Sequence, residues 1–147
     1  MKKLLAMMLA GAVSVSAGAV DWVDLGKSAN RNTQLYIDID SVRAYNKRIP
    51  LQSSSSNNFV SGFIQFTYIN NHEYRKKGWY YSKDFYIVDC SSRSYLNPGS
   101  VVYGFKDQVL DSFTQSYFTV NDFKMAYPET LGEVIVDSIC NGNHPEK

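Results

Sequence analysis

The 147-residue sequence predicts an α+β fold, with β-strands along most of the chain and a single helix near its end. Three observations support this class. Phe59 to Asn70 alternates apolar and polar residues with a period of two, as expected of a strand with one buried face. Apolar residues recur at helical spacing after Pro128. The chain also has two cysteines, the number that one disulfide requires.

Residues 1–19 have the pattern of a secretory signal peptide. Two lysines precede an apolar stretch that is too short to span a bilayer, and Ala17 to Ala19 provides a small-x-small cleavage site. We expect cleavage to leave residues 20–147 as one exported domain. Because thiols oxidise outside the cytoplasm, Cys90 and Cys140 are predicted to form a disulfide.

The composition of the mature chain narrows the class of partner. Without residues 1–19 the chain has 13 basic and 14 acidic residues, and this near-neutral balance points away from nucleic acid. No later segment approaches the ~20 apolar residues that a membrane helix needs, so no transmembrane segment is expected. The many aromatic residues, eleven Tyr among them, suit both a β-sheet and a binding surface.

The first third of the mature chain predicts short elements. Val20 to Leu25 begins apolar, and Leu35 to Ile37 predicts a short strand. Asp40 or Ser41 is expected to start a single helical turn, because either side chain can accept backbone N–H bonds. Ile49 to Leu51 contains a proline and is at most an edge segment, and the Ser/Asn tract 53–58 is expected to be an exposed loop.

Two long strands are predicted in the centre of the chain. The first is Phe59 to Asn70, where Gly62 lies on the apolar side and would let another element approach closely. His72 to Gly78 is a charged turn, and Trp79 to Cys90 is the second strand. Its alternation is poor, and either a bulge near residues 82–84 or burial on both faces would explain this.

Shorter strands are expected to follow. Asn97 to Gly99 predicts a turn, and the segments Val101 to Phe105 and Val109 to Phe113 predict a hairpin across residues 106–108. Tyr117 to Val120 is a candidate for one more strand.

The helix is predicted to begin at Pro128, with Glu129 near its positive end and Asn141-Gly142 as its stop. Its apolar stripe comprises Leu131, Val134, Ile135, Ser138 and Ile139. Cys140 lies off this stripe, beside Val136. Either the last turn is distorted or the helix is also covered on that flank.

Three stretches of the chain together resemble the surface-adhesin protein E family, a group of small exported bacterial proteins. These stretches are Leu35 to Val42, with its Tyr-Ile-Asp-x-x-Ser-aliphatic pattern, Tyr80 to Cys90, and Tyr127 to Cys140. The resemblance implies an antiparallel β-sheet of about six strands, with the C-terminal helix packed on the sheet and pinned to it by the disulfide.

The resemblance also implies a function. The member that gives the family its name is a lipoprotein adhesin that binds host matrix and plasma proteins of the vitronectin and laminin class, partly through a basic pair before the central strand. Arg75-Lys76-Lys77 has a similar place here. A lipoprotein needs a cysteine directly after the cleavage site, where this chain has Val20. We therefore expect an exported protein without a lipid anchor, located in the periplasm or at the cell surface.

The candidate binding residues are Arg75, Lys76 and Lys77, together with the neighbouring Tyr74 and Trp79. Arginine, tyrosine and tryptophan dominate interface hot spots, so this group is predicted to contact a protein partner. The competing interpretation is a solvated hairpin whose charges prevent aggregation through a neighbouring apolar strand. A second copy of the chain is a further candidate partner, and a periplasmic structural or envelope-associated protein without a host ligand is the alternative function.

Motifs for catalysis are not found in the sequence. It has no nucleophile elbow, no phosphate-binding Gly-rich loop and no histidine pair at metal spacing. His72 and His144 are expected at the surface, and Asp38 and Asp40 are better explained by solvation and turn capping than by acid–base chemistry. We therefore predict a non-enzymatic protein with no catalytic, metal or cofactor site.

Overall fold

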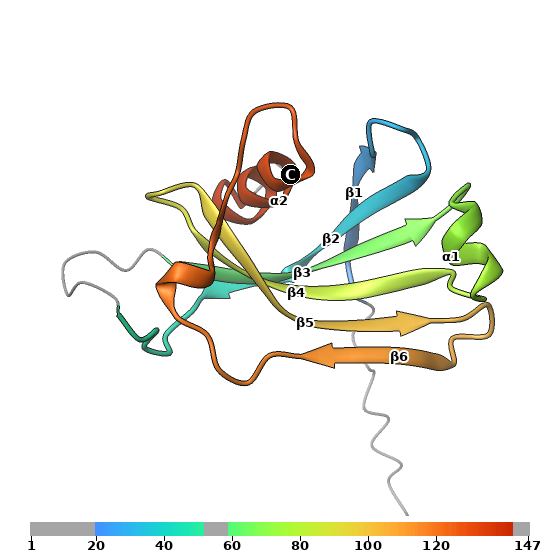
Figure 1. Ribbon diagram of the computed structural model, residues 1–147. Coiled ribbons are helices and arrows are strands. Elements are labelled where there is room, and N and C mark those ends of the chain that lie inside the picture. The colour runs from blue at the N-terminus through green and yellow to red at the C-terminus, as the bar shows by residue number, and fades with distance from the viewer. Residues whose placement is uncertain (1–19, 52–58, 143–147) are drawn as a thin grey trace, which may run out of the picture.

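The computed structural model describes residues 20–51 and 59–142 (Figure 1). The predicted signal peptide, residues 1–19, and the predicted loop at residues 53–58 lie outside this part of the chain.

Most of the described chain forms one antiparallel β-sheet, as the α+β class predicts. The sheet has seven strands, not six, and six of them follow one another in sequence order. They are β1 (Trp22–Lys27), β2 (Thr33–Ala44), β3 (Phe59–Tyr68), β4 (Tyr81–Asp89), β5 (Ser94–Tyr103) and β6 (Val109–Thr114). The seventh, β7 (Lys124–Met125), pairs with the first residues of β5. The predicted hairpin across residues 106–108 is confirmed by the pairing of β5 with β6.

The predicted helical turn at Asp40 or Ser41 is wrong, because β2 continues to Ala44. The pairing of β2 with β3 is irregular between Asp38 and Arg43. At this irregularity the Ser41 hydroxyl donates to the carbonyl of Asp38 (2.6 Å) and accepts the N–H of Phe63 (2.9 Å). One side chain thus satisfies backbone groups where the strand pairing is interrupted.

The poor alternation of β4 comes from burial on both faces. The pairing of β3 with β4 is regular throughout, so it has no bulge at residues 82–84. Tyr86 and Val88 pack on the face that carries the C-terminal helix, and Ile87 packs on the opposite face with Ile49 and Phe59. These central residues are therefore apolar on both sides of the strand.

The predicted turn at Asn97 to Gly99 is wrong, because these residues lie within β5. The pairing of β4 with β5 shifts there, so that Asn97 and Pro98 both lie opposite Tyr86. A bulge tolerates proline because the extra residue does not need to donate to the neighbouring strand.

The predicted strand Tyr117 to Val120 does not form. The chain instead makes a short 3₁₀ helix, η1 (Val120–Asp122), capped by reciprocal hydrogen bonds between Thr119 and Asp122. Segments next to it cover the sheet face turned away from the C-terminal helix. There, Phe118, Val120 and Phe123 pack around Ile49, which is 1% exposed and belongs to no strand.

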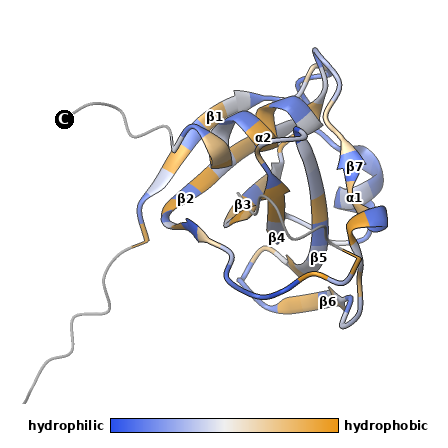
Figure 2. Cartoon of the chain, turned by 90° about the vertical axis from the view of Figure 1, so that its left-hand side faces the viewer, coloured by the Kyte–Doolittle hydropathy of each residue, from blue (hydrophilic) through white to orange (hydrophobic). Residues whose placement is uncertain are grey.

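The C-terminal helix α2 (Leu131–Cys140) packs on the other face of the sheet, which curves around it (Figures 1 and 2). Its buried residues are Gly132, Ile135, Val136, Ser138 and Ile139. Leu131 is 44% exposed and Val134 is 38% exposed, so the predicted stripe is wrong at both positions. The buried face is rotated toward Val136 and Cys140, so the flank with Cys140 is covered.

Gly62 lies against a neighbouring strand and against α2. A methyl group at this position would lie 3.3 Å from Cγ2 of Val42 and 3.6 Å from Cγ1 of Ile139. The missing side chain therefore avoids a tight contact with β2, whereas α2 would lie at an ordinary van der Waals distance from a methyl group.

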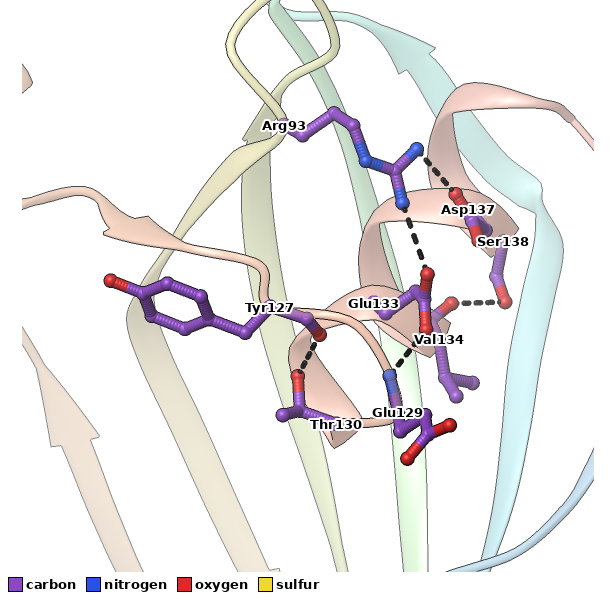
Figure 3. Close-up of polar contacts among 8 residues, drawn as sticks. All are labelled: Arg93, Tyr127, Glu129, Thr130, Glu133, Val134, Asp137 and Ser138. Carbon is purple, nitrogen blue, oxygen red and sulfur yellow. Dashed lines mark hydrogen bonds and ion pairs between the residues drawn. The ribbon is translucent and has the colours of Figure 1, made fainter.

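The helix begins later than predicted. Pro128 precedes α2, and Thr130 is its N-cap residue. Glu129 has a φ of 60°, its N–H donates to the carboxylate of Glu133 (2.8 Å), and the Thr130 hydroxyl donates to the carbonyl of Tyr127 (2.6 Å; Figure 3). These bonds form a turn that ends before Leu131. Glu133 is therefore the acidic residue of the first helical turn.

Two connections tie α2 to the turn between β4 and β5. The predicted disulfide between Cys90 and Cys140 is present. Arg93 lies between two carboxylates of α2, 2.9 Å from Asp137 and 3.7 Å from Glu133 (Figure 3). Exposed ion pairs of this kind contribute about 0–1 kcal/mol each, so the covalent bond is the stronger constraint.

The second helix, α1 (His72–Lys76), lies at the end of the sheet opposite the Cys90 turn (Figure 1). Among the described residues, neither helix is long and apolar enough to cross a membrane. Strand β6 is exposed along its whole length and forms an edge of the sheet (Figure 2).

The orientation of α2 predicts which apolar residues hold it. Ile135→Ala should lower the free energy of unfolding by about 2–5 kcal/mol, because Ile135 is 1% exposed in the core. Leu131→Ala removes the same number of carbon atoms, but from a half-exposed side chain, and should cost less than about 1 kcal/mol. Urea unfolding of both variants measures the difference. Equal losses would contradict this orientation of the helix.

Candidate functional site

The predicted binding residues lie on the connection between β3 and β4, which contains α1. Asn71 caps this short helix by accepting the N–H of Tyr74 (3.3 Å). The N–H groups of Lys77, Gly78 and Trp79 donate to carbonyls of Tyr74 and Arg75, so the helix is closed by a compact turn. The φ of Gly78 is 77°, a conformation that glycine adopts without steric cost.

Aromatic side chains form the base of this hairpin. The Tyr74 ring stacks on Trp79, with ring centres 5.3 Å apart and planes 16° apart, and its other neighbour is Tyr68 at 4.6 Å. Tyr80 packs against Phe105 at 5.0 Å, and Phe105 is 70% exposed. The hairpin therefore has a preformed aromatic surface at the end of the sheet.

Two of the three cations lie on these rings. The guanidinium of Arg75 is 4.0 Å from the centre of the Tyr80 ring, and the Lys77 ammonium is 5.1 Å from the Trp79 ring. Contacts of this type contribute about 0.5–1 kcal/mol at exposed sites. They also restrict where the two charged groups point, which lowers the entropy cost of binding.

The positive charge of the hairpin is not neutralised by ion pairs. Arg75, Lys76 and Lys77 are all exposed, and the ion pairs between described residues are those of Arg93. Glu73 is the acidic residue of α1 and is also exposed. The five predicted residues all lie on this connection, three as exposed cations and two as half-buried rings, and we call this group the α1 hairpin.

A cavity that the sequence analysis did not identify lies beside this hairpin, on the α2 side of the sheet. Its volume is about 270 Å³, and Leu131 at the start of α2 forms part of its wall. Aromatic and acidic side chains provide most of the remaining lining, namely Phe66, Tyr68, Tyr74, Tyr86 and Asp84. We call it the tyrosine cavity.

Asp84 is the charged residue of this lining, and it is half-buried. One carboxylate oxygen accepts the Ser100 hydroxyl (2.6 Å), and the other accepts the side-chain amide of Asn97 (3.3 Å). Burial raises the pKa of Asp84 above its ordinary value, and hydrogen bonds from Ser100, Ser82 and Asn97 oppose this rise. The carboxylate is therefore held by neutral donors only.

The sequence pattern of β4 could have identified Asp84 as a candidate site residue. In β4 the even-numbered residues Tyr86 and Val88 face the core under α2, and Asp84 continues the same face. A charged residue on an inward face is uncommon in a strand and indicates a functional or specific structural role.

A second cationic region lies at the other end of the sheet, on the face turned away from α2. A groove of about 720 Å³ is lined there by Arg43, Lys47, Arg48, Phe85 and Ile87, among other residues. Lys47 and Arg48 are exposed like the cations of the α1 hairpin. They provide a charge-matched comparison for experiments on that hairpin.

No family model, curated protein or solved structure matches this chain. The resemblance to the surface-adhesin protein E family therefore stays a prediction from three stretches of sequence. Within residues 20–51 and 59–142, no group of three His, Cys, Asp or Glu side chains is arranged to hold a metal ion. His72 is exposed as predicted, and His144 lies outside the described residues.

The raised pKa of Asp84 predicts a pH dependence of stability. The folded state binds the Asp84 proton more tightly than the unfolded chain, so this residue's contribution to stability falls as pH rises from about the ordinary pKa of 3.8 through the raised value. Relative to Asp84→Asn, the parent should therefore lose stability with rising pH across the acidic range. Urea unfolding of both proteins between about pH 3 and pH 7 measures this difference. If the stability of the parent minus that of Asp84→Asn stays constant or rises with pH, the pKa of Asp84 is not raised in the folded state.

Proposed function

We propose that this chain is an exported, non-enzymatic binding protein that contacts a protein partner through the α1 hairpin. The observation that carries the proposal is the set of three exposed cations, two of them placed over aromatic rings, with no ion pair among the described residues to neutralise them. Exposed positive charge that is held in place by rings favours a partner with an acidic surface.

The chemistry of the hairpin supports a protein as the partner. Trp79 and Tyr74 offer large, rigid contact areas, and Arg75 offers several donors in a fixed fork. The neighbouring Phe105 extends the apolar area next to these groups. A surface that combines aromatic rings with guanidinium and ammonium groups has the composition of an interface hot spot.

The resemblance to the adhesin family suggests which partners to test first. Host matrix and plasma proteins of the vitronectin and laminin class are the proposed ligands, because Arg75-Lys76-Lys77 has the place of the family's basic pair. The alternative is a structural or envelope-associated protein of the periplasm, whose partner would be a bacterial protein or a second copy of this chain.

Removal of two cations should slow binding. Lys76→Ala with Lys77→Ala is expected to lower the association rate about tenfold at low ionic strength, and less at high salt, because rim charges act mainly through long-range attraction. Surface plasmon resonance on immobilised vitronectin and laminin, at two salt concentrations, measures this. For the alternative function in the periplasm, proteins of a bacterial envelope extract are immobilised instead.

The control is Lys47→Ala with Arg48→Ala, which removes the same charge from the opposite end of the sheet. It should bind at nearly the parent's rate. Both double variants should melt within a few degrees of the parent, because all four side chains are exposed and the lost contact between Lys77 and Trp79 contributes only about 0.5–1 kcal/mol. If the two double variants slow binding equally, net charge acts and the α1 hairpin is not the contact surface.

The cellular location separates the two functions. An adhesin should be degraded when protease is added to intact cells, because it must be displayed outside the envelope. A periplasmic protein should resist the protease and be released by osmotic shock. Recovery of the protein in the cytoplasmic fraction, with residues 1–19 still attached, would contradict both.

A further inference from the structure

We propose that the tyrosine cavity binds a small organic ammonium ion, with Asp84 as the counter-charge and tyrosine rings as the walls. This site is distinct from the cationic surface of the α1 hairpin, and its ligand has the opposite charge. It therefore adds a small-molecule function to the proposed contact with a protein.

The first argument is the charge of the cavity. Asp84 is the charged residue in its lining, and it takes part in no ion pair of the described residues. Its oxygens accept hydrogen bonds from Ser100, Asn97 and Ser82, which are neutral, so one of the four lone pairs of the carboxylate remains for a ligand. A half-buried carboxylate gains most from a cation that replaces the water around it.

The second argument is the aromatic lining. Tyr68, Tyr74, Tyr86 and Phe66 contribute to the wall around Asp84. The Tyr68 hydroxyl donates to Ser82 (3.0 Å), and the Tyr74 ring is stacked on Trp79, so both rings are held in place without a ligand. Rings grouped around a cation attract it through their electron-rich faces, and this is how ammonium groups with several methyl substituents are recognised.

The third argument is the exclusion of other ligands. Metal sites in proteins are usually built from several His, Cys, Asp or Glu ligands, and no group of three such side chains is arranged to hold a metal ion among the described residues. An anion would be repelled by Asp84. The volume of about 270 Å³ is large enough for a small organic ion. The remaining competitor is a neutral apolar molecule of the same size.

A pair of isosteric probes separates the cation from that competitor. Choline carries a trimethylammonium group, and 3,3-dimethylbutan-1-ol has the same shape with carbon in place of the charged nitrogen. Isothermal titration of the full chain, with each probe up to about 10 mM, covers dissociation constants to about 1 mM. Choline should bind at least about tenfold more tightly than the alcohol.

A matched pair of variants tests whether Asp84 is the counter-charge of the ligand. Asp84→Asn should weaken choline binding about tenfold, and Asp40→Asn, which removes an exposed carboxylate from β2, should leave the binding unchanged. Near-ultraviolet circular dichroism checks that both variants keep the parent's aromatic packing. The Lys76→Ala, Lys77→Ala variant should bind choline like the parent, so this proposal and the one for the hairpin can fail separately.

Sedimentation with phosphatidylcholine vesicles identifies the source of the ammonium group. If the protein sediments with the vesicles and Asp84→Asn abolishes this, the ammonium group belongs to a lipid. If the protein binds choline in the calorimeter but does not sediment with the vesicles, the ligand is a free molecule. Equal binding of choline and the alcohol, no binding of choline, or full binding by a correctly folded Asp84→Asn variant would each overturn the proposal.

Discussion

The disulfide between Cys90 and Cys140 determines where α2 lies on the sheet. It joins the end of β4 to the last turn of the helix across 50 residues, and closing a loop of that length stabilises the fold by about 4 kcal/mol on the chain-entropy estimate. Arg93 reinforces the same junction through two carboxylates. With one end of α2 fixed in this way, ten residues of helix cover only one part of the sheet.

The two sites that we propose lie on the part of the sheet that α2 leaves uncovered. Beyond the start of α2, the same face continues into the tyrosine cavity, and the α1 hairpin closes the far end of β3 and β4. Tyr74 belongs to both sites, since its ring contributes to the cavity and also stacks on Trp79. The cationic residues of the α1 hairpin and the carboxylate-containing cavity thus share Tyr74. Their opposite charges would keep the two kinds of ligand apart.

The sequence allowed prediction of features that depend on neighbours along the chain. The alternation of Phe59 to Asn70 identified β3, and the five residues of the α1 hairpin could be proposed because they are nearly contiguous. The rotation of α2 could not be predicted, because apolar residues lie on two adjacent flanks and the disulfide selects the one with Val136. The tyrosine cavity was missed because its lining comes from strands, α1 and α2, which are distant in sequence. Pro98 suggested a turn because nothing in the local sequence indicates the bulge opposite Tyr86.

Hydrogen exchange with and without a reducing agent tests most directly whether the disulfide fixes α2 on an otherwise stable sheet. Reduction should increase the exchange of the α2 amides by a larger factor than that of β3 and β4, because the helix loses its covalent anchor while the strands keep their pairing. Unchanged protection of α2 after complete reduction, or an equal loss of protection in the helix and the central strands, would contradict the account.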